Sequence, residues 1–177
     1  KKFESYLNNP NRGVNSFKSK KIIPYYFLLF SNACIKKSTF NENLLDSDFI
    51  GYGGSEMEMS FRINQFMPNS ILFIPNVPVI RLNHPVLKKH LSRLEEFGEN
   101  NIFFLLKKIN IKNLPNTYKI FTIFLNKSSL IFSPLFYLIR LFLLIIISLI
   151  PNYYSNTIIK YILGLSIIIG ISKNKHI

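Results

Sequence analysis

The chain has 177 residues, which suits one domain of ordinary size with an appendage. Its formal net charge is +13, and residues 100–177 carry nine Lys or Arg and no acidic residue. These cations are scattered among Ile and Leu, which argues against a nucleic-acid partner, and the single Cys34 excludes an internal disulfide and a zinc site built from thiolates.

The first part of the chain is predicted to lead into a buried strand. Residues 1–23 are polar and are expected to form a loop or a frayed helix. The aromatic and aliphatic stretch after Pro24 predicts a strand over residues 26–36, in which Cys34 would be a buried, inert thiol.

A glycine loop and a helix follow this strand. Gly51-Tyr-Gly-Gly54 predicts a loop with unusual backbone angles. Ser55 and Glu58 have the spacing of a capping box, which predicts a helix over Ser55–Phe66.

Two short strands and a second helix complete the expected α/β domain. Ile71–Ile74 and Val77–Ile80 are predicted strands within residues 71–81, in one mixed sheet with residues 26–36. A helix is expected from Pro85 to about Phe97, ending before Gly98. Residues 24–105 would form this domain.

The rest of the chain is apolar and basic. Residues 106–127 are expected to form a basic linker, and residues 128–177 a membrane-associated tail. Residues 129–150 are long enough to span a bilayer, although Arg140 lies near their middle. The second run, Tyr161–Ile171, is short, so a helical hairpin dipping into one leaflet fits both runs better than two crossings.

Two alternatives to the membrane interpretation remain open. The two apolar runs could instead be buried helices that pack on a part of the protein outside these residues. Nucleotide bias towards Lys codons could explain many of the cations, but it explains the missing acidic residues poorly. The composition therefore favours an anionic lipid surface as a partner.

Three segments resemble family 2 glycosyltransferases, whose fold is the nucleotide-diphospho-sugar transferase (GT-A) fold. The stretch from Leu45 to Arg62 is similar to their F-D-x-x-F-x-G-Y-G-x-E-D-x-x-x-x-x-R segment. Residues 24–37 look like the preceding strand, which ends in S-N-x-x-I-K-K, and residues 74–84 resemble the strand and loop that usually carry a histidine. The resemblance implies the carboxy-terminal, acceptor-side half of a GT-A mixed sheet with flanking helices.

The resemblance assigns the catalytic base to Glu56. Glycosyl transfer needs a carboxylate that takes the proton of the acceptor hydroxyl. In the family this group is the Asp of the E-D pair, and Glu56 occupies that position. Ser55 stands where the family has Glu, which departs from the pattern, and Glu58 is expected to be the capping partner of Ser55.

Substrate and metal positions also follow from the resemblance. Asn32, Tyr52, Gly53, Gly54 and Arg81 would bind substrate, with Arg81 or His84 facing the leaving phosphates.

His84 would also contribute to a divalent metal site for Mg²⁺ or Mn²⁺, whose main ligands would lie outside this chain. Asp46-Ser47-Asp48 has the form of a metal-binding D-x-D motif, but its polar surroundings predict a turn with Asx-type hydrogen bonds instead.

Together these features predict a glycosyltransferase of the inverting type at the cytoplasmic face of the plasma (inner) membrane. It would transfer a sugar from a nucleotide-sugar donor to a glycan or lipid-linked acceptor, and the chain would lack the donor-binding half. The alternative is a non-catalytic membrane-associated protein or a decayed glycosyltransferase fragment.

Overall fold

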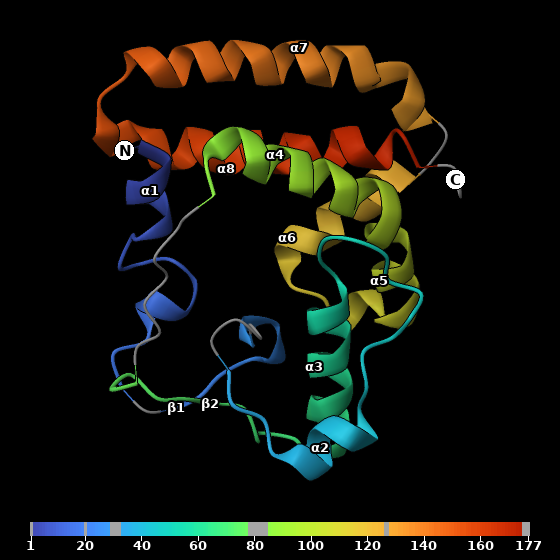
Figure 1. Ribbon diagram of the computed structural model, residues 1–177. Helices are drawn as coiled ribbons and strands as arrows, with labels where there is room; N and C mark the ends of the chain where they lie inside the picture. Colours follow the sequence, from blue (N-terminus) through green and yellow to red (C-terminus); the bar gives the residue numbers. More distant parts are fainter. Residues whose placement is uncertain (1, 20, 29–32, 78–84, 126–127, 175–177) are drawn as a thin grey trace.

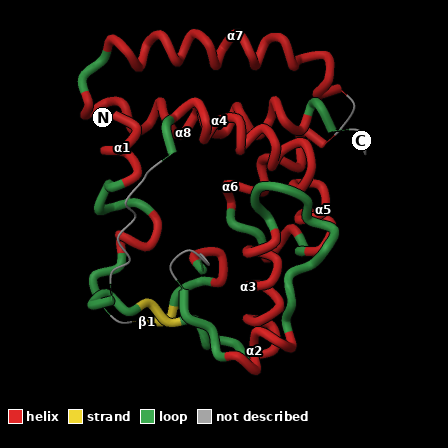
Figure 2. Tube along the Cα trace, viewed as in Figure 1, coloured by secondary structure: helices red, strands yellow, loops and turns green. Residues whose placement is uncertain are grey.

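The protein is mostly helical. The computed structural model describes residues 2–19, 21–28, 33–77, 85–125 and 128–174 (Figure 1). Helix accounts for 66% of the structure and strand for 3%, with a two-stranded sheet only (Figure 2). The predicted GT-A mixed sheet is therefore wrong for the described part of the chain.

The elements follow one another in this order. The α-helices are α1 (Lys2–Leu7), α2 (Lys37–Glu42), α3 (Ser55–Phe66), α4 (Leu87–Glu96), α5 (Ile102–Lys108), α6 (Asn116–Lys119), α7 (Ser128–Leu149) and α8 (Asn152–Ile171). A π-helical segment, Phe97–Asn101, joins α4 to α5, and short 3-10 helices span Gly13–Ser16, Tyr25–Phe27, Ile111–Asn113 and Ile120–Leu125. Strands β1 (Lys21–Ile22) and β2 (Leu72–Phe73) pair antiparallel.

In the described residues the predicted strands are largely replaced by irregular backbone; of the predicted strand Val77–Ile80 only Val77 is described. Within residues 24–36 the described part forms a 3-10 turn and a loop, and within residues 71–81 it forms only β2. The apolar side chains of this region pack against α3 instead of extending a sheet: the Tyr25 and Phe61 rings meet edge-on at 5.2 Å. Short apolar runs do not distinguish a strand from other buried segments, which explains the error. Cys34 is exposed, so its predicted burial is also wrong.

Tyr25 anchors this irregular segment to the body of the protein. Its hydroxyl donates to the Asn113 carbonyl at 2.7 Å. Burial, with smaller contributions from Tyr26 and Tyr118, raises the pKa of Tyr25 to about 12, so the hydroxyl remains a donor across the physiological pH range.

Helix α3 matches its predicted bounds, but its expected cap does not form. Gly54 is the N-cap residue and makes no side-chain capping bond. Glu58 is 4% exposed and accepts two hydrogen bonds from Arg62, at 2.8 and 3.0 Å. The capping-box role of Glu58 is therefore wrong, because Ser55 lies inside the first turn rather than before it.

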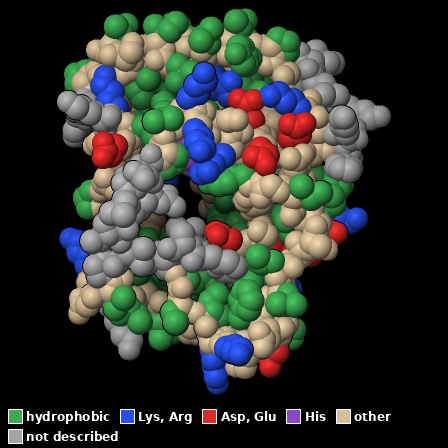
Figure 3. All heavy atoms as spheres, viewed as in Figure 1, with side chains coloured by type: hydrophobic (Ala, Val, Ile, Leu, Met, Phe, Trp, Pro, Cys, Tyr) green, Lys and Arg blue, Asp and Glu red, His purple; other side chains and the backbone are tan. Residues whose placement is uncertain are grey.

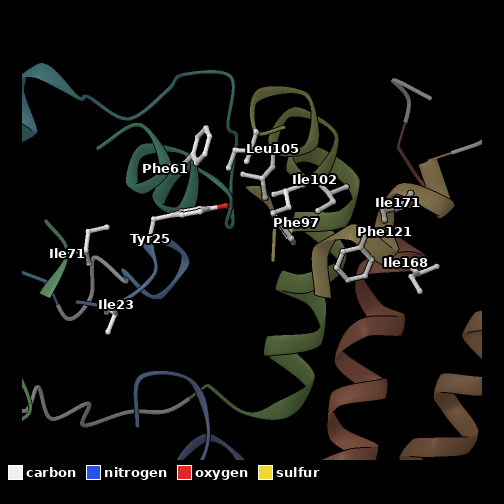
Figure 4. Close-up of a cluster of buried hydrophobic side chains, with 12 residues drawn as sticks. Ile23, Tyr25, Phe61, Ile71, Phe97, Ile102, Leu105, Phe121, Ile168 and Ile171 are labelled. Atoms are coloured by element: carbon white, nitrogen blue, oxygen red, sulfur yellow. The ribbon is translucent and has the colours of Figure 1, made fainter. Parts of the chain in front are cut away.

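Helix α8 is the central element of the protein. It lies between α7 and α4 and runs antiparallel to α7 (Figure 1). Its residues Ile168 and Ile171 belong to a large hydrophobic cluster that reaches Phe61 of α3 (Figure 4). Ile159 and Ile162 belong to a second cluster with side chains of α1, α4 and α7. The predicted tail thus supplies much of the core.

Two glycines let α8 approach α4 and the π-helical segment closely. A Cβ atom on Gly98 would collide with the Ile167 carbonyl, and one on Gly170 would collide with the Glu95 carbonyl. Helix α4 ends at Glu96, close to its predicted end at about Phe97, but the helical path continues through the π-helical segment into α5, and Gly98 serves backbone packing.

An ion pair between Arg140 and Glu95 fixes α7 against α4 and α8. Arg140, 8% exposed, donates to Glu95 Oε1 of α4 at 2.5 Å and to Ser166 Oγ of α8 at 3.0 Å. Lys173 donates to the other Glu95 oxygen at 2.6 Å. Burial alone would raise the pKa of Glu95, but the hydrogen bonds from Lys173 and Arg140 outweigh it and hold the pKa below its ordinary value.

Helix α7 contains a segment, Phe132–Leu149, that is long and apolar enough to cross a membrane by length and composition. Only 11% of this segment is buried inside the protein, which distinguishes it from the core helix α8. Membrane association of the chain is supported to this extent.

Substituting Gly170 tests the close approach of α8 to α4. Gly170→Ala should lower the unfolding free energy by about 1–3 kcal/mol, because the added methyl group meets backbone that cannot rotate away. Gly164→Ala is the matched control in the same helix, where a Cβ atom meets nothing within 4 Å. It should leave stability unchanged or raise it by up to about 1 kcal/mol through helix propensity. Thermal unfolding in mild detergent measures both, and equal effects would contradict the packing.

Glu95→Gln tests the ion pair through its pH dependence. A carboxyl group with a lowered folded pKa stabilises the protein above its unfolded pKa of about 4.3, and this stability is lost as the pH falls. The variant should be less stable than the wild type by about 1.5–3 kcal/mol at pH 7. The difference should shrink as the pH falls below about 4.3 and vanish only below the folded pKa of Glu95. The exposed Glu42→Gln serves as control and should track the wild type at every pH.

Candidate functional site

The predicted glycine loop is a rigid turn that leads into α3. Gly51, Gly53 and Gly54 have φ angles of 74°, 82° and 94°, in the left-handed region that side chains other than glycine rarely adopt. A Cβ atom on Gly53 would press on the Phe97 ring, and one on Gly54 would collide with Phe49. The loop therefore needs glycine for both backbone angle and space.

Asn101 holds this loop from the π-helical segment. Its side chain is fully buried. The amide nitrogen donates to the carbonyls of Ile50, Tyr52 and Gly53 at 2.9, 3.1 and 2.8 Å, and the amide oxygen accepts from the Ile50 N–H at 3.0 Å. One side chain thus satisfies backbone groups that a sheet or helix would otherwise pair.

Glu96 supplies a second clamp on the same loop. Its carboxylate accepts from the Tyr52 N–H at 3.2 Å, and a Cβ atom on Gly51 would collide with the same oxygen. The Arg93 guanidinium lies over the Tyr52 ring, 5.5 Å from its centroid. The loop is therefore pinned to α4 and the π-helical segment along its length.

The structure brings together part of the predicted site. Tyr52, Gly53 and Gly54 form the clamped loop, and Glu56 lies half-buried in the first turn of α3, directly after it. Asn32, Arg81 and His84 lie outside the described residues. The described part of the site is a glycine-rich loop with one aromatic side chain, Tyr52, followed by a carboxylate.

Asp46 and Asp48 form a turn, as predicted. Asp46 Oδ1 accepts from the Asp48 N–H at 2.9 Å, which is an Asx-type bond. Both carboxylates also face Lys108: Asp46 is hydrogen-bonded to it, and Asp48 lies 2.7 Å away. The Lys108 hydrogen bond, with the Asp48 N–H, lowers the pKa of Asp46, and the two carboxylates raise the pKa of Lys108.

These aspartates do not fit a divalent metal, because an ammonium group already occupies the space between them. Within the described residues no group of three or more His, Cys, Asp and Glu side chains could hold a metal ion. The expected Mg²⁺ or Mn²⁺ finds no ligand set in this part of the chain.

Asn101 and Glu96 were missed by sequence reasoning. They are more than 40 residues from the loop they hold, and their spacing carries no motif. The π-helical segment that aims Asn101 inward is also invisible in the hydrophobic pattern. Single π turns are frequent at functional sites, so its position behind the loop is notable.

No protein-family model, curated protein or solved structure matches the chain.

Asn101→Asp tests the clamp. The carboxylate that replaces the amide nitrogen would face three carbonyl oxygens, so we expect a loss of at least about 1–3 kcal/mol in unfolding free energy. Hydrogen exchange of the amides in residues 50–54 should become faster. Asn110→Asp is the matched control: Asn110 is exposed, and its oxygen accepts from the Lys112 N–H, a bond that Asp retains. Unchanged exchange in the Asn101 variant would show that the loop does not depend on this side chain.

Proposed function

We propose that this chain is the acceptor-side part of a sugar transferase bound to the cytoplasmic face of the plasma (inner) membrane. The observation that carries the proposal is the clamped glycine loop, which precedes a helix with Glu56 in its first turn. This arrangement accompanies the resemblance of residues 45–62 to the family 2 segment. The mixed sheet is no part of the proposal.

In this proposal Glu56 is the general base. Its carboxylate takes the proton from an acceptor hydroxyl while that oxygen forms a bond to the anomeric carbon of the donor sugar. The bond between the anomeric carbon and the nucleoside diphosphate breaks, and the diphosphate leaves with the electron pair. The donor site, with any metal ion that serves it, would be formed by residues outside the described part of the chain.

Two features of the loop support this role. Negatively charged side chains are favoured near a helix N-terminus, which suits a base that must be ionised. Glu56 closely follows Gly53 and Gly54, so the fixed backbone of the loop sets where its carboxylate lies. The clamp by Asn101 would keep the carboxylate in position, and precise placement is essential for proton transfer.

The second candidate is a non-catalytic, membrane-associated helical protein, which would include a decayed transferase. The helical fold and the absence of a metal-binding group in the described residues favour it. Ser55 in place of the family's Glu favours it as well. Measuring transfer separates the two candidates.

Glu56→Gln should reduce sugar transfer by about 10²–10⁴-fold in the full-length protein, because Gln keeps the size of Glu but cannot accept the proton. The assay measures nucleoside diphosphate released from a panel of nucleotide sugars, with membrane extracts as acceptors. Glu42→Gln is the control and should retain activity, since Glu42 is an exposed residue of α2. Glu58→Gln is unsuitable because the Arg62 ion pair would be weakened. An active Glu56→Gln variant would exclude Glu56 as the base, and no release in the wild type would favour the second candidate.

A further inference from the structure

We propose that α7 lies in the plane of an anionic lipid bilayer, with its outer face in one leaflet, and does not cross it. The inference deepens the membrane part of the proposed function and rests on it. It depends on which side chains of α7 pack against the protein and which are exposed.

The outer face of α7 is largely apolar. Its exposed large side chains extend from Phe132 to Leu149: Phe132, Leu135, Tyr137, Leu138, Ile139, Leu141, Phe142, Ile145 and Leu149. Their exposed fractions range from 39% for Ile139 to 79% for Leu149. Hydrophobic side chains gather along the top edge of the molecule in Figure 3, where α7 lies. The face is too long and too apolar to be an ordinary water-exposed helix surface.

The inner face of α7 is committed to the protein. Ile147 is buried, Leu143 and Leu144 pack on the second hydrophobic cluster, and Phe136 packs on the first. Arg140 belongs to this face, where Glu95 and Ser166 hold its guanidinium. The rest of the protein thus takes the place of the polar face that an interfacial helix normally carries.

A crossing by α7 would break these contacts. The helix would have to leave α4, with α8 or without it, and bring Arg140 into hydrocarbon without Glu95. An orientation parallel to the lipid surface keeps every one of these contacts and still buries the outer face. The length and composition of α7 alone would have suggested the opposite.

Lipid is favoured over a protein partner by the chemistry of this face. Among its described, exposed side chains only Tyr137 and Ser148 carry a polar atom, whereas protein interfaces usually form about one hydrogen bond per 100–200 Å². Lysines lie at both ends of the helix: Lys2 donates to the Ile147 and Ile150 carbonyls, and Lys173, which pairs with Glu95, follows Ser172, which bonds Ser133. With no acidic residue in 100–177, these ends suit anionic headgroups.

Depth measurements distinguish the two orientations. Single cysteines replace Leu135, Phe142 or Leu149 in a Cys34→Ser background and carry a fluorophore. These positions are seven residues apart, share one helix face and span about 21 Å. The protein is bound to vesicles of phosphatidylcholine and phosphatidylglycerol that contain lipids with quenchers at known depths. Quenching of the fluorophore should place all three positions at the same depth. A central depth for residue 142 with 135 and 149 near opposite surfaces would overturn the proposal.

Binding measurements identify the partner. Phe142→Glu should weaken flotation with these vesicles by about tenfold or more. The control Phe66→Glu should bind as the wild type does, since Phe66 is 77% exposed at the end of α3. Binding should weaken in pure phosphatidylcholine and with added salt.

Two outcomes would overturn the assignment of lipid as the partner. One is an equal loss of vesicle binding in Phe142→Glu and Phe66→Glu; the other is a dimer that Phe142→Glu dissociates without changing flotation. Sugar transfer is scored in a separate assay, so failure of either proposal is distinguishable from failure of the other.

Discussion

The close packing of α4 and its π-helical extension against α8 is the constraint on which the rest of the structure depends. Gly98 and Gly170 bring the backbones of α4, its π-helical extension and α8 together. Side chains of α4 and the extension then point to two different parts of the protein. Glu95 holds α7 and the chain end through Arg140 and Lys173, whereas Glu96 and Asn101 hold the glycine loop. One helical rod thus connects the apolar outer helix with the candidate site.

This arrangement explains why the apolar end of the chain is not a detachable anchor. Helix α8 contributes to both hydrophobic clusters and touches α1, α4 and the π-helical segment. Its loss would expose apolar surface of every element that it covers, with a cost of about 25 cal/mol per Å². Helix α7 is different, because most of its apolar surface contributes nothing to the folding of the protein and is left for another partner.

Sequence reasoning succeeded where local chemistry decides the backbone. Helix α3 begins and ends where its pattern predicted, and the Asp46 turn forms as expected, because glycine angles, helical periodicity and Asx bonds act over a few residues. It failed where distant partners decide. The apolar stretch after Pro24 has no sheet to join, so Tyr25 packs on Phe61 instead. Asn101 and Glu96 could not be found, since nothing near them in sequence indicates the loop that they hold.

The energetic effect of Arg140 depends on whether its charge has a partner. From sequence it was an obstacle in an apolar segment, costing about 2.5–3.5 kcal/mol at a bilayer centre. In the structure its charge is matched by Glu95, whose pKa is lowered despite burial. Removing one partner of such a pair is expensive, because it leaves the other charge buried and uncompensated. The pair therefore fixes the rotation of α7 about its own axis, and that rotation turns a largely apolar face outward.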